Sequence, residues 1–503
     1  MKSENRLAIL GIDSLDPYVI LKYRNHLPNF SALIEKSPTF ISESVFPVDT
    51  IPAWASIFTG LHPGNHGLIY AYDVFDSTLS DLRKLDISPI KGRTFWDIAS
   101  KEGFRVVIVF PMLMYPAWEV NGVMVSKSPF ESRIDWLRTE RDIDIYPNTA
   151  RGIYGIPEKM DDLWGGFPGL KSLENWAETG KKILEKEKNL GLVLFQKEKW
   201  DLFFIYFSIL DIIQHRLWRF FDKNDPTYSE NRLKGKILEF YKIFDRILGE
   251  FVQIDPEISM VIMSDHGHMI RPYITVNLNE YLRYGGYLAS GGQRMRIMKN
   301  IRKILLEVAN NLDIEDQIIK LITGSQKLMK ISKSVYSMKG SIDLKKSKAY
   351  LSTFAGIKSY PHGGIEINRN LVSEMSYEET REELMEFLSL VRTREGRPLL
   401  KWVKRREDIF DGRFVEKIYP DVVFELNENY GVGWDINADL YGKAYDHKVA
   451  SGGHARDAVF LLRNINKEIG IREISVMDVA PSILDVLGID LRRFEFDGKT
   501  IFK

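Results

Sequence analysis

The stretch LFFIYFSILDIIQHRLW, residues 202–218, decides the fold class. Its first six residues form an unbroken apolar run, which is typical of a strand buried on both faces of a sheet. A helical pattern follows directly. In it Asp211 and His215 are four residues apart, so a helix places both side chains on one face. A buried strand that leads straight into a helix is the repeating unit of parallel α/β sheets.

The same alternation continues along the chain. Further apolar runs that indicate buried strands lie at residues 7–13, 105–110, 259–265, 421–426 and 458–463. Helical patterns lie at residues 94–104, 173–199, 232–252 and 376–393. We therefore expect an α/β fold with a mostly parallel central sheet and helices on both faces. Active sites in such folds gather beyond the carboxyl ends of the strands.

Composition excludes several classes of function. The chain of 503 residues has 69 basic and 69 acidic side chains, so no net charge favours a nucleic-acid polymer as partner. It has no cysteine, which leaves Asp, Glu and His as candidate metal ligands. Because no hydrophobic leader and no apolar run of membrane-spanning length is found, we expect a cytoplasmic protein.

One segment departs from the α/β alternation. Residues 294–348 carry thirteen Lys and Arg against five Asp and Glu in a helix-friendly sequence. We expect an inserted basic helical cap at residues 291–348, within a catalytic core formed by residues 1–290 and 349–503. Its charge suits either a solvated helical face or a surface that attracts an anionic substrate or the lipid headgroups of a membrane.

Carboxylates and histidines gather at or beside the ends of the predicted strands. They are Asp13, Asp211, His215, Asp265, His266 and His454. Each of them, taken alone, also suits a turn, a cap or a structural role. Together they supply enough nitrogen and oxygen ligands for two divalent ions, the arrangement that suits in-line displacement at phosphorus.

Thr50 lies between two prolines in VFPVDTIPAWASIFTGLHPGNHG, residues 45–67, and marks the start of a helix. Two roles suit a threonine there. Its hydroxyl either caps the helix or is exposed where the helix dipole favours an anion such as phosphate. Beside two divalent ions, the same hydroxyl would serve as a nucleophile toward phosphorus.

The order of these residues resembles that of the alkaline phosphatase superfamily. The most similar branch is the type I phosphodiesterase/nucleotide pyrophosphatase branch, with its prokaryotic predicted phosphodiesterases and phosphomutases. The resemblance rests on TIPAWASIFTGLHPGNHG (residues 50–67), D-x2-QH-x2-W (211–218), VNLNEYLRYGGYL (276–288) and MDVAPSILDVLGI (477–489).

The resemblance implies an alkaline-phosphatase-like sheet, Thr50 as the nucleophile and two divalent ions. Zinc is the usual ion of this branch, and manganese serves in the related mutases. The implied ligands are Asp211, His215 and His454 for one ion, and Asp13, Asp265, His266 and the Thr50 oxygen for the other.

The chain also departs from the branch. Ala53 occupies the position of an Asn that holds a phosphoryl oxygen there. Substrate positioning must therefore differ, through the backbone N–H groups after Thr50 or through a side chain such as Trp54. Further candidate substrate contacts are His362 and Arg456. The sulfatase pattern is absent, because Thr-Ile-Pro-Ala-Trp lacks both the modifiable residue and the Arg of that pattern.

The resulting hypothesis is a two-metal phosphodiesterase of nucleotide pyrophosphatase type. It works through a covalent phospho-threonine on a small diester, either a nucleotide or a lipid-like molecule. A phosphomonoesterase or phosphomutase on the same scaffold is the alternative, although a monoester dianion usually requires an added cation such as Arg. The alternative from another class is a metal-containing binding protein without turnover.

Overall fold

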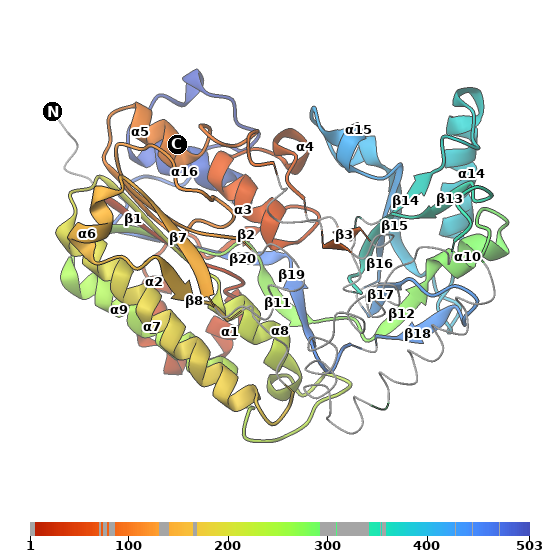
Figure 1. Ribbon diagram of the computed structural model, residues 1–503, viewed down its shortest axis with the longest axis horizontal. Helices are drawn as coiled ribbons and strands as arrows, with labels where there is room; N and C mark the ends of the chain where they lie inside the picture. The colour runs from red at the N-terminus through yellow and green to blue at the C-terminus, as the bar shows by residue number, and fades with distance from the viewer. Residues whose placement is uncertain are drawn as a thin grey trace.

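The computed structural model describes residues 6–69, 72–73, 78–79, 86–129, 140–163, 169–291, 308, 342–352, 354, 359–427, 429–444, 446–471 and 473–503. They form a larger lobe around one wide sheet and a smaller lobe built by residues 274–444 (Figure 1). In the described residues, no helix combines the length and the apolar character that crossing a bilayer requires.

The larger lobe is built on a mostly parallel sheet, as predicted. Its strands are β1 (Leu7–Ile12), β2 (Ile41–Glu43), β5 (Val106–Val109), β6 (Gly122–Lys127), β7 (Glu140–Tyr146), β8 (Lys159–Asp161), β9 (Leu202–Phe207), β10 (Ser259–Met263) and β20 (Asp457–Arg463). Within the described residues the order is β2-β20-β10-β1-β9-β5-β6-β7-β8. The strands from β10 to β6 are parallel. The remaining pairs are antiparallel.

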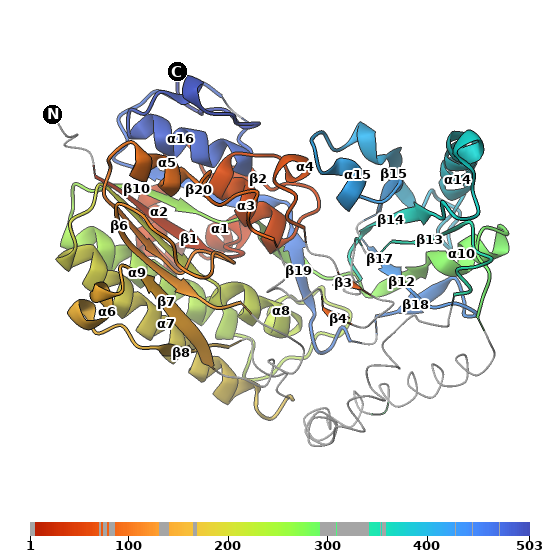
Figure 2. The ribbon, with the colours of Figure 1, turned by 45° about the horizontal axis from the view of Figure 1, so that its top comes forward.

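Helices cover both faces of this sheet (Figure 2). One face carries α1 (Pro17–Lys22), α2 (Pro28–Ile34), α7 (Leu173–Lys197), α8 (Ile209–Phe221) and α9 (Lys236–Ile254). The other carries α3 (Thr50–Thr59), α5 (Phe95–Lys101) and α16 (Val479–Val486). Ala8 and Leu10 join the first hydrophobic cluster, and Leu7 and Ile9 join the second. Successive side chains of a strand point to opposite faces, so a strand between two helical layers is apolar throughout.

The smaller lobe has its own sheets and its own hydrophobic cluster. Its strands are β12 (Ile274–Asn277), β13 (Ala349–Leu351), β14 (His362–Ile367), β15 (Leu400–Arg405), β16 (Val422–Leu426), β17 (Tyr430–Gly433) and β18 (Tyr441–Lys443). Its helices include α10 (Leu278–Tyr284), α14 (Tyr377–Ser389) and α15 (Val415–Ile418). The predicted strand at residues 421–426 is β16, but it pairs with β14 and β15 and not with the central sheet. A short apolar run shows that a strand is buried but not which sheet it joins.

The smaller lobe extends beyond the predicted insertion. Its described strands begin at β12 and end at β18, which is a wider range than residues 291–348. Residues 292–307 and 309–341, which make up most of the predicted basic cap, lie outside the described residues.

Two features join the lobes close to the site. The strands β11 (Gly267–Ile270) and β19 (Gly452–Ala455) pair with each other where the chain leaves and re-enters the larger lobe (Figure 1). In addition, the ring of Phe46 packs against Phe354 and Phe410 of the smaller lobe, with centroids 6.1 and 5.9 Å away. Phe46 precedes α3 by only a few residues, so the smaller lobe packs next to the start of that helix.

Further described elements lie around the larger lobe and at the lobe junction. They include α4 (Pro63–His66), α6 (Thr149–Tyr154), and a short hairpin of β3 (Tyr72–Asp73) and β4 (Thr78–Leu79).

Candidate active site and metal centre

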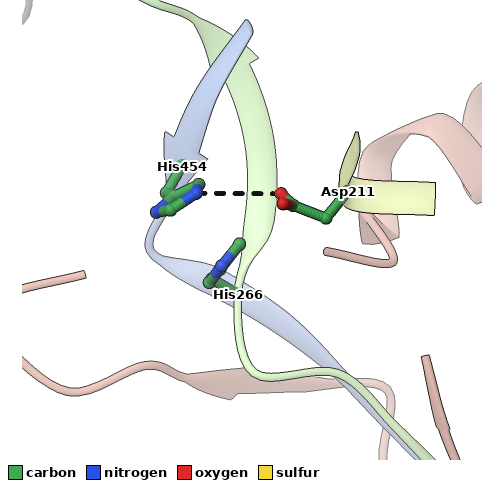
Figure 3. Close-up of side chains that lie close together, drawn as sticks. All are labelled: Asp211, His266 and His454. Atoms are coloured by element: carbon green, nitrogen blue, oxygen red, sulfur yellow. Dashed lines mark ion pairs between the residues drawn. The ribbon is translucent and has the colours of Figure 1, made fainter. Parts of the chain in front are cut away.

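The carboxyl ends of three central strands bring the predicted ligands together. Asp13 follows β1, Asp211 lies in the first turn of α8 after β9, and Asp265 and His266 follow β10. His454 comes from β19, and Figure 3 shows it beside Asp211 and His266. All five side chains are buried. The loops at this edge of the sheet therefore build one compact polar cluster inside the protein.

Asp211, His215 and His454 form the first group of donor atoms. His215 Nε2 lies 3.3 Å from Asp211 Oδ1, which confirms that the two residues share one face of a helix. His454 Nε2 lies 3.0 Å from His215 Nε2 and 3.7 Å from Asp211 Oδ1. Zinc-to-nitrogen distances of about 2.0–2.1 Å place two ligands of a tetrahedral site about 3.3 Å apart. The three donor atoms thus have the spacing of ligands to one ion.

The second group is centred on His266. Its Nε2 lies 3.2 Å from Asp265 Oδ2, 3.8 Å from Asp13 Oδ1 and 3.2 Å from Thr50 Oγ1. The His266 ring also stacks on that of His454, with centroids 3.9 Å apart. Donor atoms of Asp13, Asp265 and His266 all lie within 4.8 Å of one another, and so do those of Asp211, His266 and His454. His266 therefore lies between the two groups.

Backbone carbonyl groups orient the three histidines. His215 Nδ1 lies 2.8 Å from the carbonyl oxygen of Gly452. His266 Nδ1 lies 3.0 Å from that of Gly267, and His454 Nδ1 lies 3.1 Å from that of Val48. Only a protonated Nδ1 can donate to a carbonyl oxygen, so in the neutral ring Nε2 carries the lone pair. Each Nε2 faces the carboxylates, which is the arrangement that a metal-binding histidine adopts.

Three buried carboxylate oxygens in this cluster accept no hydrogen bond from any described residue. They are Asp13 Oδ1, Asp211 Oδ1 and Asp265 Oδ2. Each faces a histidine Nε2 within 4 Å. Burying carboxylate oxygens without partners costs several kcal/mol, and divalent cations would compensate all three. A donor set of imidazole and carboxylate fits zinc or manganese.

The crowding of charge changes the acidity of the three carboxyl groups. Burial, together with repulsion from Asp265 and Asp211, raises the pKa of Asp13 well above its ordinary range. Burial likewise raises the pKa of Asp265 to about 6, although the neighbouring His266 opposes the shift. Burial acts in the same direction on Asp211, but His215 and the nearby histidines outweigh it and lower the pKa of Asp211. The surroundings therefore disfavour the ionised forms of Asp13 and Asp265 and favour that of Asp211.

The structure distinguishes between the two roles considered for Thr50. Asp49, and not Thr50, caps α3: the Asp49 backbone is extended, and its carboxylate accepts a hydrogen bond from the N–H of Ile51. Thr50 is the first residue of the helix. Its hydroxyl faces His266 Nε2. The hydroxyl is therefore presented to the candidate metal centre at a helix N-terminus.

The side chain of Trp54, an expected substrate contact, is buried in the core beside the candidate metal centre. Its side chain is 1 % exposed and packs edge-on against Tyr206, with ring centroids 5.0 Å apart. Trp54 Nε1 donates to Asp13 Oδ2 at 3.3 Å, and the Tyr206 hydroxyl donates to the same oxygen. Trp54 lies one helical turn after Thr50, on the face of α3 that packs on the sheet. It orients a candidate ligand from inside the core.

The other two expected substrate contacts are Arg456 and His362. Arg456 is on the surface, with 54 % of its side chain exposed and its Nε 2.6 Å from the Glu43 carboxylate. His362 is buried in an aromatic cluster between the lobes, with its ring 5.4 Å from that of Phe46 and 5.5 Å from that of Tyr360. The sequence around Arg456 and around His362 does not show where these side chains point, because the residues that contact them are distant along the chain.

Three further groups, one of them His268 two residues after His266, contact the cluster. Tyr206 donates to Asp13 and lies opposite Gly11 in the register of β9 and β1. The buried His268 has its Nδ1 2.8 Å from Ser14 Oγ. Tyr360 places its hydroxyl 3.5 Å from His454 Nε2. Sequence inspection offers a signal for two of these residues, since Tyr206 is near a strand end and His268 follows Asp265 and His266 closely.

Comparison with known proteins agrees with this geometry. Residues 7–453 match the family described as type I phosphodiesterase/nucleotide pyrophosphatase. Phosphonoacetate hydrolase from Sinorhizobium meliloti 1021, solved with phosphonoformate, shares the fold with a TM-score of 0.53 at 15% identity; the match covers 96% of this chain and 95% of that one. None of the curated proteins matches the chain in sequence.

Two solved ectonucleotide pyrophosphatases/phosphodiesterases are also similar. Human ectonucleotide pyrophosphatase/phosphodiesterase 5 is 16% identical to this chain, with a TM-score of 0.48. The match covers 98% of this chain and 97% of that one. An inactive variant of murine ectonucleotide pyrophosphatase/phosphodiesterase 5, solved in complex with AMP, is 14% identical, with a TM-score of 0.48. The match covers 99% of this chain and 98% of that one.

Proposed function

The chain belongs to the type I phosphodiesterase/nucleotide pyrophosphatase family, and on this premise we propose that it is a two-metal phosphodiesterase that works through a covalent phospho-threonine at Thr50. Membership makes the chain a metal-dependent hydrolase of phosphoric esters. The number of ions, the nucleophile and the preference for diesters are our proposal.

One observation carries the proposal: the Thr50 hydroxyl lies 3.2 Å from His266 Nε2 while Asp49 performs the capping of α3. A hydroxyl that does not cap its helix, and that faces a buried histidine among candidate metal ligands, is placed to serve as a nucleophile. Its position at the N-terminus of a ten-residue helix also favours a negatively charged phosphate.

We assign Asp211, His215 and His454 to one ion, and Asp13, Asp265, His266 and the Thr50 oxygen to a second. When bound, such ions neutralise charge on the phosphate and lower the pKa of a coordinated hydroxyl. The unpartnered carboxylate oxygens and the orientation of the histidines support this assignment. Zinc is the first ion to test, and manganese is the second.

The reaction has two displacements. Thr50 Oγ1 forms a bond to phosphorus while the bond to the leaving oxygen breaks, and the threonine proton ends on the released alcohol or nucleotide. Water then attacks the phospho-threonine, the bond from phosphorus to Oγ1 breaks, and the hydroxyl of Thr50 is restored. The second product is a phosphate monoester.

The experiment compares initial rates on bis-p-nitrophenyl phosphate and p-nitrophenyl phosphate, using protein stripped of metal and reloaded with zinc or manganese. We expect a preference for the diester. Thr50→Ala should lower the rate at least about a thousandfold while the bound metal content changes little, and Thr50→Ser should keep part of the activity. Peptide mapping of acid-quenched protein after reaction with bis-p-nitrophenyl phosphate should find a p-nitrophenyl phosphoryl group on Thr50.

The alternatives predict other outcomes. A monoester preference would favour a phosphomonoesterase or phosphomutase. The surface pairing of Arg456 with Glu43 argues against it, because a monoester dianion usually requires an added cation and the side chain of this candidate contact pairs with a carboxylate. Metal binding without any activity that depends on Thr50 would favour a binding protein without turnover.

For the substrate we propose a small phosphate diester, either a nucleotide or a lipid-like molecule, with a cytoplasmic location for the protein. Contact with a membrane would use the basic segment at residues 291–348, most of which lies outside the described residues.

A further inference from the structure

The first turn of α3 offers few hydrogen-bond donors to a phosphate group. The N–H of Ile51 points to the Asp49 carboxylate at 3.5 Å, and the N–H of Ala53 donates to the Asp49 carbonyl oxygen at 3.1 Å. Pro52 has no N–H. The backbone groups that follow the nucleophile are thus already engaged or lacking. Apart from the N–H of Thr50 itself, hydrogen bonds to a bound phosphate would therefore come from other parts of the chain.

Tyr360 brings a hydroxyl from the smaller lobe to the candidate metal centre. Its Oη lies 3.5 Å from His454 Nε2, and its ring centroid lies 5.3 Å from that of His454. The side chain is only 4 % exposed. Its ring stacks on His362 with centroids 5.5 Å apart and an angle of 18° between the planes. This stacking determines where the hydroxyl points.

The loop that carries Tyr360 is held by the sheets of the smaller lobe. The carbonyl oxygen of Tyr360 accepts a hydrogen bond from Val432 at 2.9 Å, and that of Pro361 accepts one from Leu426 at 2.6 Å. A Cβ atom at Gly431 would lie 2.1 Å from the carbonyl oxygen of Ser359, so glycine permits this close approach. The hydroxyl is consequently placed in advance, as a group that stabilises developing charge must be.

The tautomer of His454 limits what the Tyr360 hydroxyl can do. Because Nδ1 donates to the Val48 carbonyl oxygen, His454 Nε2 is an acceptor, and the tyrosine hydroxyl is the donor toward it. The same Nε2 lone pair is the one that would coordinate an ion. Once an ion uses that lone pair, the hydroxyl of Tyr360 lies beside the ion's ligand, where it can donate to an oxygen of a bound substrate.

We propose that Tyr360 is a catalytic residue, contributed by the smaller lobe, that donates a hydrogen bond to the leaving-group oxygen of the substrate. This inference rests on the proposed function. In an in-line displacement the leaving oxygen lies opposite the nucleophile. Thr50 lies beside His266, whereas Tyr360 lies beside His454 in the other donor group.

The tyrosine keeps its proton in this role. As the bond from phosphorus to the leaving oxygen breaks, negative charge develops on that oxygen, and the neutral hydroxyl stabilises it through the hydrogen bond. In the second displacement the same hydroxyl is positioned to accept or donate a hydrogen bond with the attacking water, by reversal of the first step.

Tyr360→Phe tests the proposal on a series of methyl aryl phosphate diesters with leaving groups from p-nitrophenol to phenol. We expect kcat/KM to fall by about 10- to 100-fold. The loss should grow as the leaving group becomes more basic, so that the plot of log kcat/KM against leaving-group pKa becomes steeper. A purely structural role would lower all rates by the same factor.

A second measurement does not depend on activity. The zinc retained by Tyr360→Phe in competition with a chelator should equal that of the wild type, because the hydroxyl serves the substrate and is not a metal ligand.

Tyr419→Phe is the matched control. Tyr419 is buried in the same lobe, and its hydroxyl has no hydrogen-bond partner among the described residues. This variant should keep the wild-type slope and the wild-type rates.

The outcomes separate the two proposals. A wild type that cleaves diesters, with an unchanged slope in Tyr360→Phe, overturns the role of Tyr360 and leaves the proposed function standing. Loss of zinc in Tyr360→Phe also overturns it, since the residue would then be a ligand. A wild type that cleaves no diester overturns the proposed function, and the role of Tyr360 with it.

Discussion

The indole N–H of Trp54 donates to Asp13 Oδ2 across 3.3 Å, and so connects the helix that carries the candidate nucleophile to the end of the first strand. The Tyr206 hydroxyl donates to the same carboxylate oxygen. Asp13 Oδ1 is thereby left to face His266 Nε2 at 3.8 Å. The hydrophobic core itself thus orients one of the candidate metal ligands, and this arrangement predicts a way to weaken one ion without touching a ligand.

Trp54→Phe should lower the affinity of the ion held by Asp13 by about 10- to 100-fold, because hydrogen bonds that orient a metal ligand have effects of that size. It should also destabilise the protein through lost packing, by about 1–3 kcal/mol. Chelator competition measures the first effect, and thermal unfolding measures the second.

Trp96→Phe is the control for this experiment. Trp96 is buried in the same hydrophobic cluster, and its Nε1 has no hydrogen-bond partner among the described residues. It should show the stability loss without the change in metal affinity. Equal metal affinity in both variants would contradict the orienting role of Trp54.

Replacing single carboxylates should change the number of bound ions. The wild type should bind two zinc ions per chain, and Asp13→Asn and Asp211→Asn should each bind one, because each variant removes a ligand from a different group. Elemental analysis after gel filtration gives the ratio. The control variant Glu43→Gln, which removes an exposed ion pair with Arg456, should still bind two zinc ions. A single zinc ion in the wild type would contradict the two-ion assignment and indicate one site shared by the two donor groups around His266.

Zinc should also stabilise the protein. Three carboxylate oxygens have no hydrogen-bond partner among the described residues, and bound cations would compensate them, so the metal-free form should be the less stable one. At a free zinc concentration one hundred times the dissociation constant, the expected gain is about 2.7 kcal/mol per site. Unfolding midpoints with and without a chelator measure it, and equal midpoints would argue against metal binding in the folded state.

Gly452→Ala should disrupt the donor group of Asp211. A Cβ atom at this position would lie 2.1 Å from His268 Nε2 and 2.6 Å from the carbonyl oxygen of Gln214. Because the Gly452 carbonyl orients His215, displacing this strand moves two histidines at once. We expect loss of one zinc ion and at least about a tenfold loss of activity.

Gly152→Ala provides the comparison for this glycine. A Cβ atom there meets nothing within 4 Å, and the residue lies in α6, away from the site. This variant should match the wild type in both zinc content and rate.

Glu366 predicts a pH dependence of stability in the smaller lobe. Burial, and then repulsion from Asp421, raises its pKa from 4.5 to about 7, although Ser352, Arg406 and Arg369 oppose the shift. A carboxyl group whose pKa is raised by folding contributes stability below its unfolded value, and the contribution is lost as the pH rises through about 7. The full effect is about 3 kcal/mol at most.

Glu366→Gln should therefore be more stable than the wild type at pH 8 and similar to it at pH 4.5, the ordinary pKa of the group. Unfolding curves at the two pH values test this. Glu374→Gln, at a side chain that is almost fully exposed, should behave as the wild type at both. A difference between Glu366→Gln and the wild type that does not vary with pH would contradict the shift.

Local sequence patterns were sufficient to predict the architecture of the larger lobe. The apolar runs at residues 7–13 and 202–207 require helices on both faces of a sheet, and β1 and β9 are buried throughout. The spacing of Asp211 and His215 is a local property of one helix, so it too could be read directly from the sequence. Ligands that lie at strand ends converge because parallel strands share one carboxyl edge.

Only the tertiary structure decided which side chains meet across the chain. Whether Asp49 or Thr50 caps α3 depends on backbone angles that both residues can adopt. Trp54 points into the core and Arg456 toward Glu43, and Tyr360 reaches His454 from another lobe. The physical reason is that periodicity records burial and local geometry, whereas these contacts depend on how distant segments pack, which no short stretch of sequence encodes.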